Sequence, residues 1–259
     1  MSINKKLVAL LAAALLILSA AVLIIGQSHQ ASGQNVHSGD TQPDYAKSNS
    51  RQQPSPAPSP RREENKKPAD PTKYTYEFNQ PQFTTPHIVI EHDALGVGKI
   101  TFERQGEGTA IVEPVELSTA ALGRIMGLWT TLHFLDSTED YQASKQFPHL
   151  GTMRISMNDG KRSRMAEFNW SNNKAAASLV NEYRRVADQA MLVFDLTVAR
   201  ENQPLNAPGL LSAFDSLLKR SGLSDPYQLV PLLRDLSQDE HLPLIARNQA
   251  SQLLKRIEK

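Results

Sequence analysis

The sequence lacks cysteine, and it lacks a marked excess of either charge. Without cysteine the chain has no disulfide framework and no lipid-modified cysteine anchor, so a folded domain must be stabilised by its core alone. Nine Lys/Arg and five Asp/Glu precede Tyr74, which leaves 19 basic and 22 acidic residues from Tyr74 onward, a net charge of −3. Nucleic acid is therefore not an expected partner.

One long apolar run is present near the N-terminus. It spans residues 7–26, and its only hydroxyl group is that of Ser19. At about 1.5 Å per helical residue such a run reaches about 30 Å, the hydrocarbon thickness of a bilayer, so it predicts a transmembrane signal anchor. Two lysines precede it and no Lys or Arg follows before Lys47. The positive-inside rule then places residues 1–6 in the cytoplasm and the body outside.

The alternative for this run is cleavage as a secretory signal. Ser19-Ala20-Ala21 could serve as the cleavage site, and the product would be secreted. Apolar residues 22–25 continue beyond that site, which favours retention. We therefore expect a single-pass protein of an inner or plasma membrane with a periplasmic body, bound to the membrane through its N-terminal helix.

Residues 27–73 change in composition to Gln, Ser, Asn and Pro, with PSPAPSP at 54–60. A segment with so few aliphatic side chains cannot bury enough apolar surface to offset its ordering entropy, so it predicts a disordered linker. The charged stretch RREENKKP at 61–68 mixes both signs, which is typical of a solvated linker.

The next stretch, residues 74–205, predicts an α+β domain. Alternating apolar residues predict strands at 74–78, 87–92, 99–105, 109–115, 152–157 and 165–170. Helical spacing predicts a helix over 119–134, in which Trp129 belongs to the core, and Ser118 is a suitable N-cap. Trp170 is also predicted to be buried. The fold class is an antiparallel sheet with two helices on one face.

Local turn and cap residues support this order of elements. Asn158-Asp159-Gly160 separates two alternating segments and predicts a hairpin. Asn172 and Asn173 predict the cap of the second helix, which ends near Asn202. Its apolar stripe is predicted to comprise Leu179, Tyr183, Val186, Ala190, Val193 and Thr197.

Residues 206–259 predict a C-terminal helical segment. Helices are expected from Pro208 to about Lys219, after Asp225-Pro226, and from about Leu242 to Ile257. The apolar stripes that need a covering surface comprise Leu229, Leu232, Leu233, Ile245, Leu253, Leu254 and Ile257. We therefore expect this segment to pack on the α+β domain or on a partner.

Two segments resemble known families. GKITFERQGEG, VELSTAALGRIMGLW and GTMRISMNDGKRSRMAEFN, followed by a helix, resemble the strand-strand-helix-strand-strand plan of emfourin-like small bacterial proteins. Members of that family include an inhibitor of thermolysin-like metalloproteases, but no inhibitory residue matches a position here. The layout also resembles uncharacterised secreted bacterial proteins, and residues 229–257 resemble a single HEAT-type helical hairpin. These resemblances imply no specific activity.

The loop at 134–151 contains the candidate catalytic residues Asp136, Glu139, Asp140 and His149. Two carboxylates could act as acid and base or hold a hard cation. The loop has neither EF-hand spacing nor the glycine that turns such a loop around an ion. An envelope hydrolase or metal-binding protein is therefore the alternative function.

Other short patterns predict neither a cofactor nor a metal. Gly96, Gly98 and Lys99 lack the spacing of a phosphate loop and lead into a strand. His87 and His92 lie on opposite faces of one strand, so they do not converge on a metal. Because no catalytic motif is found, we expect a binding module for an envelope protein or peptide, and its sheet could offer an edge strand.

Overall fold

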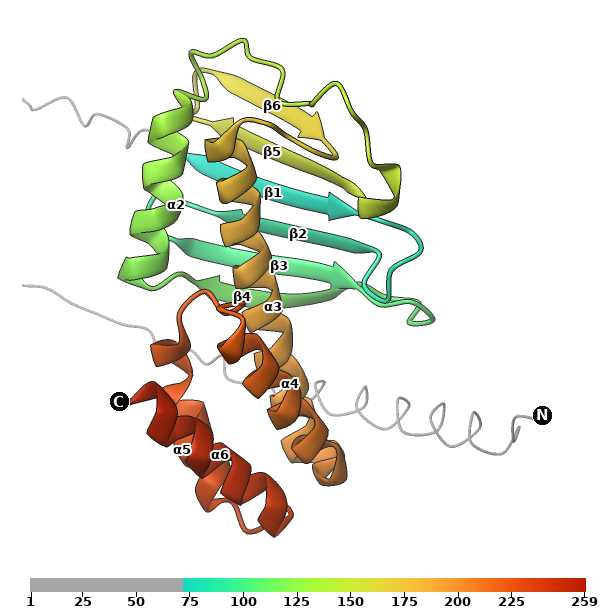
Figure 1. The fold of residues 1–259 in the computed structure, drawn as a ribbon, viewed down its shortest axis with the longest axis vertical. Helices are drawn as coiled ribbons and strands as arrows, with labels where there is room; N and C mark the ends of the chain where they lie inside the picture. The colour runs from blue at the N-terminus through green and yellow to red at the C-terminus, as the bar shows by residue number, and fades with distance from the viewer. Residues whose placement is uncertain (1–71) are drawn as a thin grey trace, which may run out of the picture. The chain divides into compact units, whose positions relative to one another are not determined.

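Six antiparallel strands form one sheet in the computed structural model, which describes residues 72–259 (Figure 1). The strands are β1 (Lys73–Asn79), β2 (His87–His92), β3 (Val97–Glu103), β4 (Ile111–Glu116), β5 (Thr152–Asn158) and β6 (Ser163–Phe168). Their order across the sheet is β4-β3-β2-β1-β5-β6. The predicted α+β class with an antiparallel sheet is confirmed.

The predicted anchor at 7–26 and the linker up to residue 71 lie outside the described residues. Within residues 72–259, no helix combines the length and the apolar character that crossing a bilayer requires.

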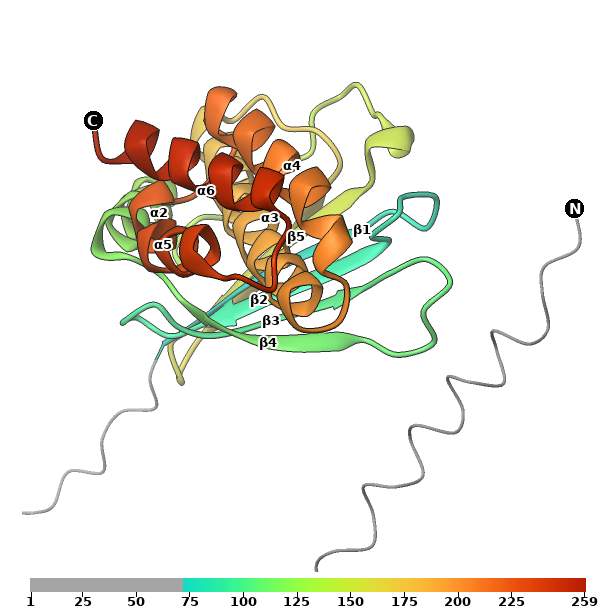
Figure 2. The same cartoon turned by 90° about the horizontal axis from the view of Figure 1, so that it is seen from below.

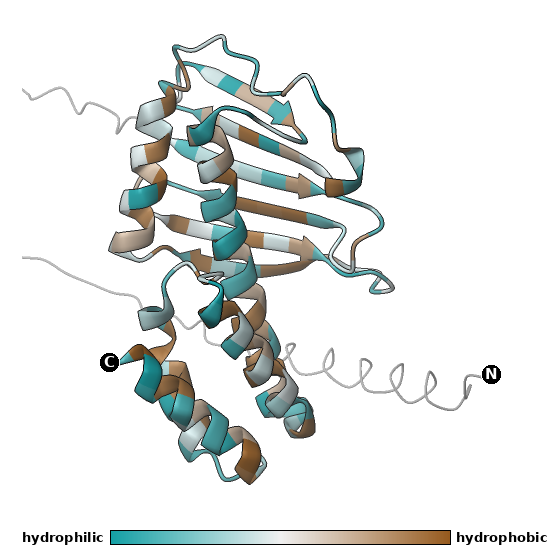
Figure 3. Cartoon of the chain, in the orientation of Figure 1, coloured by the Kyte–Doolittle hydropathy of each residue, from teal (hydrophilic) through white to brown (hydrophobic). Residues whose placement is uncertain are grey.

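Alternation along the strands places one face of the sheet in the core. Tyr76 pairs with Ile90 and Ile155, and Ile90 pairs with Ile100, which gives a buried row across four strands. All four side chains are at most 1% exposed. Polar residues point to the opposite face, and Figure 3 shows this alternation along β5. The period of two that predicted the strands therefore also determines which face is buried.

Two helices cover this face, as Figure 1 shows. They are α2 (Thr119–Leu132) and α3 (Lys174–Asn202). The Ser118 hydroxyl accepts a hydrogen bond from the Ala121 N–H at 3.1 Å, and the Asn173 side chain accepts from Ala175 and Ala176 at 3.0 Å. Both predicted caps are confirmed. The helix predicted to reach residue 134 ends at Leu132, because His133 has a left-handed backbone with φ 44°.

The tight turn between β2 and β3 explains the glycines at 94–101. Gly96 lies in the turn with φ 82°. A Cβ atom on Gly98 would lie 1.8 Å from the Glu91 carbonyl oxygen, so only glycine fits there. The segment connects two strands, as its lack of phosphate-loop spacing indicated.

The long helix α3 contributes to two separate cores. Leu179 and Tyr183, in its first half, are fully buried against the sheet. Leu192 and Leu196, further along, belong to a second core with the C-terminal helices. The predicted stripe is wrong at Thr197, which is exposed. The buried side of α3 changes because its second half extends past the sheet and packs against different helices (Figure 1).

The C-terminal segment consists of α4 (Ala207–Lys219), α5 (Val230–Gln238) and α6 (Leu244–Ile257), with a short 3-10 turn at Pro226–Leu229. These helices pack on one another and on the second half of α3 (Figure 2). Leu229, Leu233, Leu253 and Ile257 are buried as the sequence predicts. Ile245 is 60% exposed, so its predicted burial is wrong.

Polar contacts join the C-terminal segment to the first helices. Arg124 on α2 donates to the Glu182 carboxylate at 3.1 Å and to the Ser224 carbonyl oxygen at 2.6 Å. The Gln189 side chain on α3 accepts from the Asp225 N–H at 2.9 Å. The segment is thus held at a fixed place on the α+β domain.

A buried hydrogen-bonded chain crosses the first core. The Asp93 carbonyl oxygen, 2.7 Å from His92 Nδ1, can only accept, so Nδ1 carries a proton. Neutral Nε2 then accepts from the Tyr183 hydroxyl at 2.8 Å, and that hydroxyl accepts from Trp129 Nε1 at 3.0 Å. His92 is only 3% exposed, and its burial lowers its pKa below the usual 6.5.

This histidine predicts a loss of stability in mild acid. The folded state favours neutral His92, so its contribution is fully present above pH 6.5 and is lost as the pH falls below that value. The loss should be at most about 1.4 kcal/mol per pH unit. Urea unfolding of the wild type and of His92→Gln between pH 7 and 5.5 measures it. The wild type should lose more stability than the variant, and equal pH dependence would contradict the assignment.

Candidate functional site

The four candidate residues of the acidic loop have separate local partners. Asp136, whose side chain is 71% exposed, forms an ion pair at 2.5 Å with Arg162 of the β5–β6 hairpin. Glu139 accepts from the Asn173 side chain at 3.0 Å, at the start of α3. Asp140 accepts from a backbone N–H two residues on, and His149 is exposed. In the part of the chain that the structure describes, no three His, Asp or Glu side chains are placed to hold a metal ion.

The same loop lies against β6. Arg164 on β6 donates to the carbonyl oxygens of Phe134 and Glu139 at 2.8 and 2.5 Å. Its guanidinium lies over the Phe134 ring, 4.6 Å from the centroid. The Ala143 N–H donates to the Trp170 carbonyl oxygen at 2.9 Å, just beyond the end of β6. These contacts fix the loop beside an edge strand of the sheet.

The outer edge of β4 is poorly suited to accept another strand. The Leu117 N–H donates inward to the Gly96 carbonyl oxygen, so even-numbered residues of β4 direct their backbone groups outward. Pro114 is one of these and has no N–H to donate. The Glu116 carbonyl oxygen, also outward, already accepts from the Gln228 side chain at 3.0 Å. A proline and a covered acceptor are typical protections of an edge strand.

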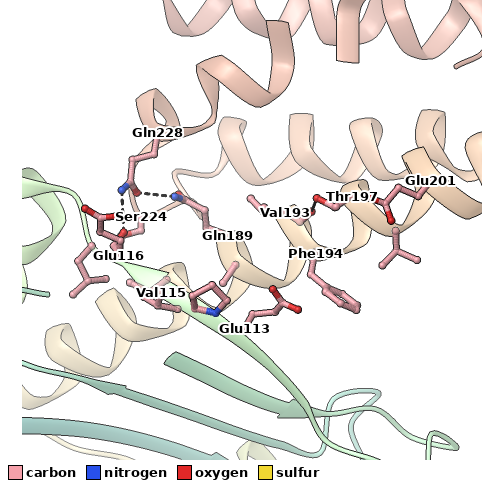
Figure 4. Close-up of a pocket in the computed structure, with 15 residues that line it drawn as sticks. Glu113, Val115, Glu116, Gln189, Val193, Phe194, Thr197, Glu201, Ser224 and Gln228 are labelled. Carbon is pink, nitrogen blue, oxygen red and sulfur yellow. Dashed lines mark hydrogen bonds between the residues drawn. The ribbon is translucent and has the colours of Figure 1, made fainter. Parts of the chain in front are cut away.

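A cavity of about 370 Å³ lies between β4, α3 and the C-terminal segment (Figure 4). The Gln189 side-chain amide donates a hydrogen bond across it to the Gln228 side-chain oxygen at 3.1 Å, and the Gln228 amide donates to the Glu116 carbonyl oxygen. Glu113 and Glu201 also line it. Most of its polar contacts attach the C-terminal segment, so we interpret this cavity as a joint between elements.

A larger groove of about 940 Å³ opens at the end of the sheet where β1 ends and β5 begins. The β1–β2 loop, the β6–α3 connection and one side of α3 form its walls. We call it the aromatic groove, and its apolar lining includes Phe78, Phe83, Ile88, Met153, Phe168, Trp170 and Met191. Its volume and apolar lining are typical of ligand pockets.

Two aromatic rings form the rim of the aromatic groove. Phe83 is 43% exposed and packs against Phe78, with 5.7 Å between ring centroids. Trp170 is 45% exposed, so its predicted place in the core is wrong. β6 ends at Phe168, and Trp170 follows in the connection to α3, where its ring lies edge to face with Phe147, with 5.3 Å between ring centroids. Both rings leave large apolar surfaces accessible to a ligand.

A buried hydroxyl without a partner lines the groove. Tyr76 is 1% exposed and its ring stacks on Tyr183, yet its hydroxyl makes no hydrogen bond to any of residues 72–259. Burial raises the pKa of Tyr76 to about 12, so this group is a neutral donor at physiological pH. The positive charge of the nearby Arg184 guanidinium opposes that rise in part. An unsatisfied buried donor favours a ligand acceptor at this position.

Charged residues of α3 line the same groove. Asp188 is partly buried, and burial raises the pKa of its carboxyl group. Arg220 lies 3.9 Å from that carboxylate. Arg184 and Asp188 are four residues apart on a helix, a spacing that in sequence is typical of a solvated surface pair. The sequence therefore gave no signal that distinguished these side chains from ordinary surface charges.

No protein-family model matches the chain, and no curated protein matches it either. The function has therefore to be inferred from the side chains of the aromatic groove.

Proposed function

We propose that residues 72–259 are the ligand-binding body of a membrane-tethered protein of the bacterial cell envelope. The segment at 7–26 would anchor the chain, and the linker would let the body search for its ligand near the membrane. A flexible linker of this length has a root-mean-square span of about 35–40 Å. The aromatic groove is the proposed binding site.

The unpartnered Tyr76 hydroxyl carries this proposal. A buried donor without an acceptor costs about 1–3 kcal/mol, which a bound ligand could recover. Phe83 and Trp170 add two half-exposed rings beside it, and exposed aromatic surface in a concavity is typical of binding sites. The acidic loop offers no comparable feature, because its carboxylates interact with Arg162, Asn173 and the local backbone.

The first binding prediction concerns the groove rim. The neutral fluorescent probe N-phenyl-1-naphthylamine should bind saturably, and Phe83→Ser or Trp170→Ser should weaken its binding about tenfold, since each removes about 1.4 kcal/mol of apolar contact. Titration of probe fluorescence measures the dissociation constants.

Tyr227→Ser is the matched control, because Tyr227 is 66% exposed and lies outside the groove. Its affinity for the probe should equal that of the wild type, and circular dichroism should confirm that all variants are folded. Absence of saturable binding, or equal weakening by the control, would reject the groove as the binding site.

A further inference from the structure

Arg184, on α3, presents a cation to the aromatic groove. Its guanidinium lies 5.7 Å from the centroid of the Phe78 ring and donates to the Met153 sulfur at 3.4 Å. A thioether is a weak acceptor. Among the described residues, the Arg184 side chain forms no ion pair, whereas the adjacent Arg185 pairs with Glu182 at 2.9 Å. Arg184 is thus available to an anion that enters the groove.

The Tyr76 hydroxyl lies near this guanidinium but comes from a different element. Tyr76 projects from β1 and Arg184 from α3, and both line the groove. One is a neutral O–H donor and the other a charged N–H donor. A carboxylate has two oxygens that could accept from both at once, and a bond to an ionised acceptor is stronger than one to a neutral group.

Asp188 limits the charge of such a ligand. Its carboxylate lies one turn beyond Arg184 on α3 and is 3.9 Å from Arg220. The site therefore combines two guanidinium groups with one carboxylate and is only weakly positive. A dianion would be repelled by Asp188 more strongly than a monoanion.

We propose that the ligand of the aromatic groove is an apolar molecule that ends in a carboxylate. The carboxylate accepts from Tyr76 and Arg184, and the apolar part lies against Phe83 and Trp170. This inference rests on the proposed function, and it adds the chemical class of the ligand.

Competition with the bound naphthylamine probe tests the ligand class. Decanoate, 1-decanol and decyl phosphate share one apolar chain and differ in the head group. At pH 7.5 decanoate should displace the probe at about tenfold lower concentration than 1-decanol. Arg184→Gln and Tyr76→Phe should each reduce that preference, measured for each variant as the ratio of the two displacing concentrations, to about threefold or less.

Arg185→Gln is the matched control and should keep the full preference, since Arg185 is paired with Glu182 and does not line the groove. Equal displacement by decanoate and 1-decanol would overturn the carboxylate assignment. Stronger displacement by decyl phosphate would overturn the monoanion assignment. In both cases saturable, Trp170-dependent binding of the probe would leave the proposed function standing. Failure of the probe itself to bind would reject the proposed function.

Discussion

Replacing Phe214 by alanine is expected to destabilise the protein by about 3–5 kcal/mol, the usual cost of removing a fully buried aromatic side chain. Phe214 on α4 is 0% exposed and belongs to the second core. That core shares the continuous helix α3 with the first one. We therefore expect the first core, which contains the sheet, to lose stability as well, because α3 is one continuous helix that packs in both cores.

Trp129 reports on the first core, where it is 2% exposed. Urea unfolding should be followed by circular dichroism and by Trp129 fluorescence in a Trp170→Phe background. Phe214→Ala should shift both transitions to lower urea concentrations together. Leu205→Ala is the control and should change the free energy of unfolding from either signal by no more than about 0.5 kcal/mol, since Leu205 is 82% exposed. A change in the helical signal with an unmoved Trp129 transition would show instead that the C-terminal helices fold independently.

Tyr183→Phe should lower the free energy of unfolding by about 2–4 kcal/mol, although it removes a single oxygen atom. The hydroxyl is shared by Trp129 Nε1 at 3.0 Å and His92 Nε2 at 2.8 Å, and all three side chains are buried. Its removal leaves a buried donor and a buried acceptor without partners, each at a cost of about 1–3 kcal/mol.

Equilibrium unfolding in urea at pH 7.5 measures this loss. Tyr227→Phe is the control at an exposed tyrosine and should change the free energy of unfolding by less than about 0.5 kcal/mol. A loss below about 1 kcal/mol for Tyr183→Phe would mean that the hydrogen-bonded chain contributes little to stability.

Local chemistry made much of the fold predictable. Ser118 and Asn173 cap their helices through side-chain oxygens, and Asp159-Gly160 forms the β5–β6 turn with φ 82° at the glycine. Each of these signals involves residues close in sequence, so it can be recognised from a short segment of the chain. The end of α2 was less predictable, because His133 adopts a left-handed backbone where glycine is the usual residue.

The aromatic groove was not predictable, because its parts come from distant segments. Tyr76 fits the alternation of a core strand, Arg184 fits the polar side of a helix, and Trp170 looks like the end of a buried strand. The spacing of each residue is ordinary for its own element. The sequence instead suggested a site at Asp136 and Asp140, which lie four residues apart. In the structure each has its own local partner, and the two do not form a shared site.

By itself, then, the sequence determined the α+β class, the order of strands and helices along the chain, and the face of the sheet that is buried. Periodicity and capping are local, and a side chain's position in a strand or helix follows from them. Only the tertiary structure decided that Thr197 and Ile245 are exposed, that Trp170 lies at a rim, and that Tyr76 and Arg184 line one groove. These outcomes depend on which distant surface covers each residue, and periodicity within one element does not contain that information.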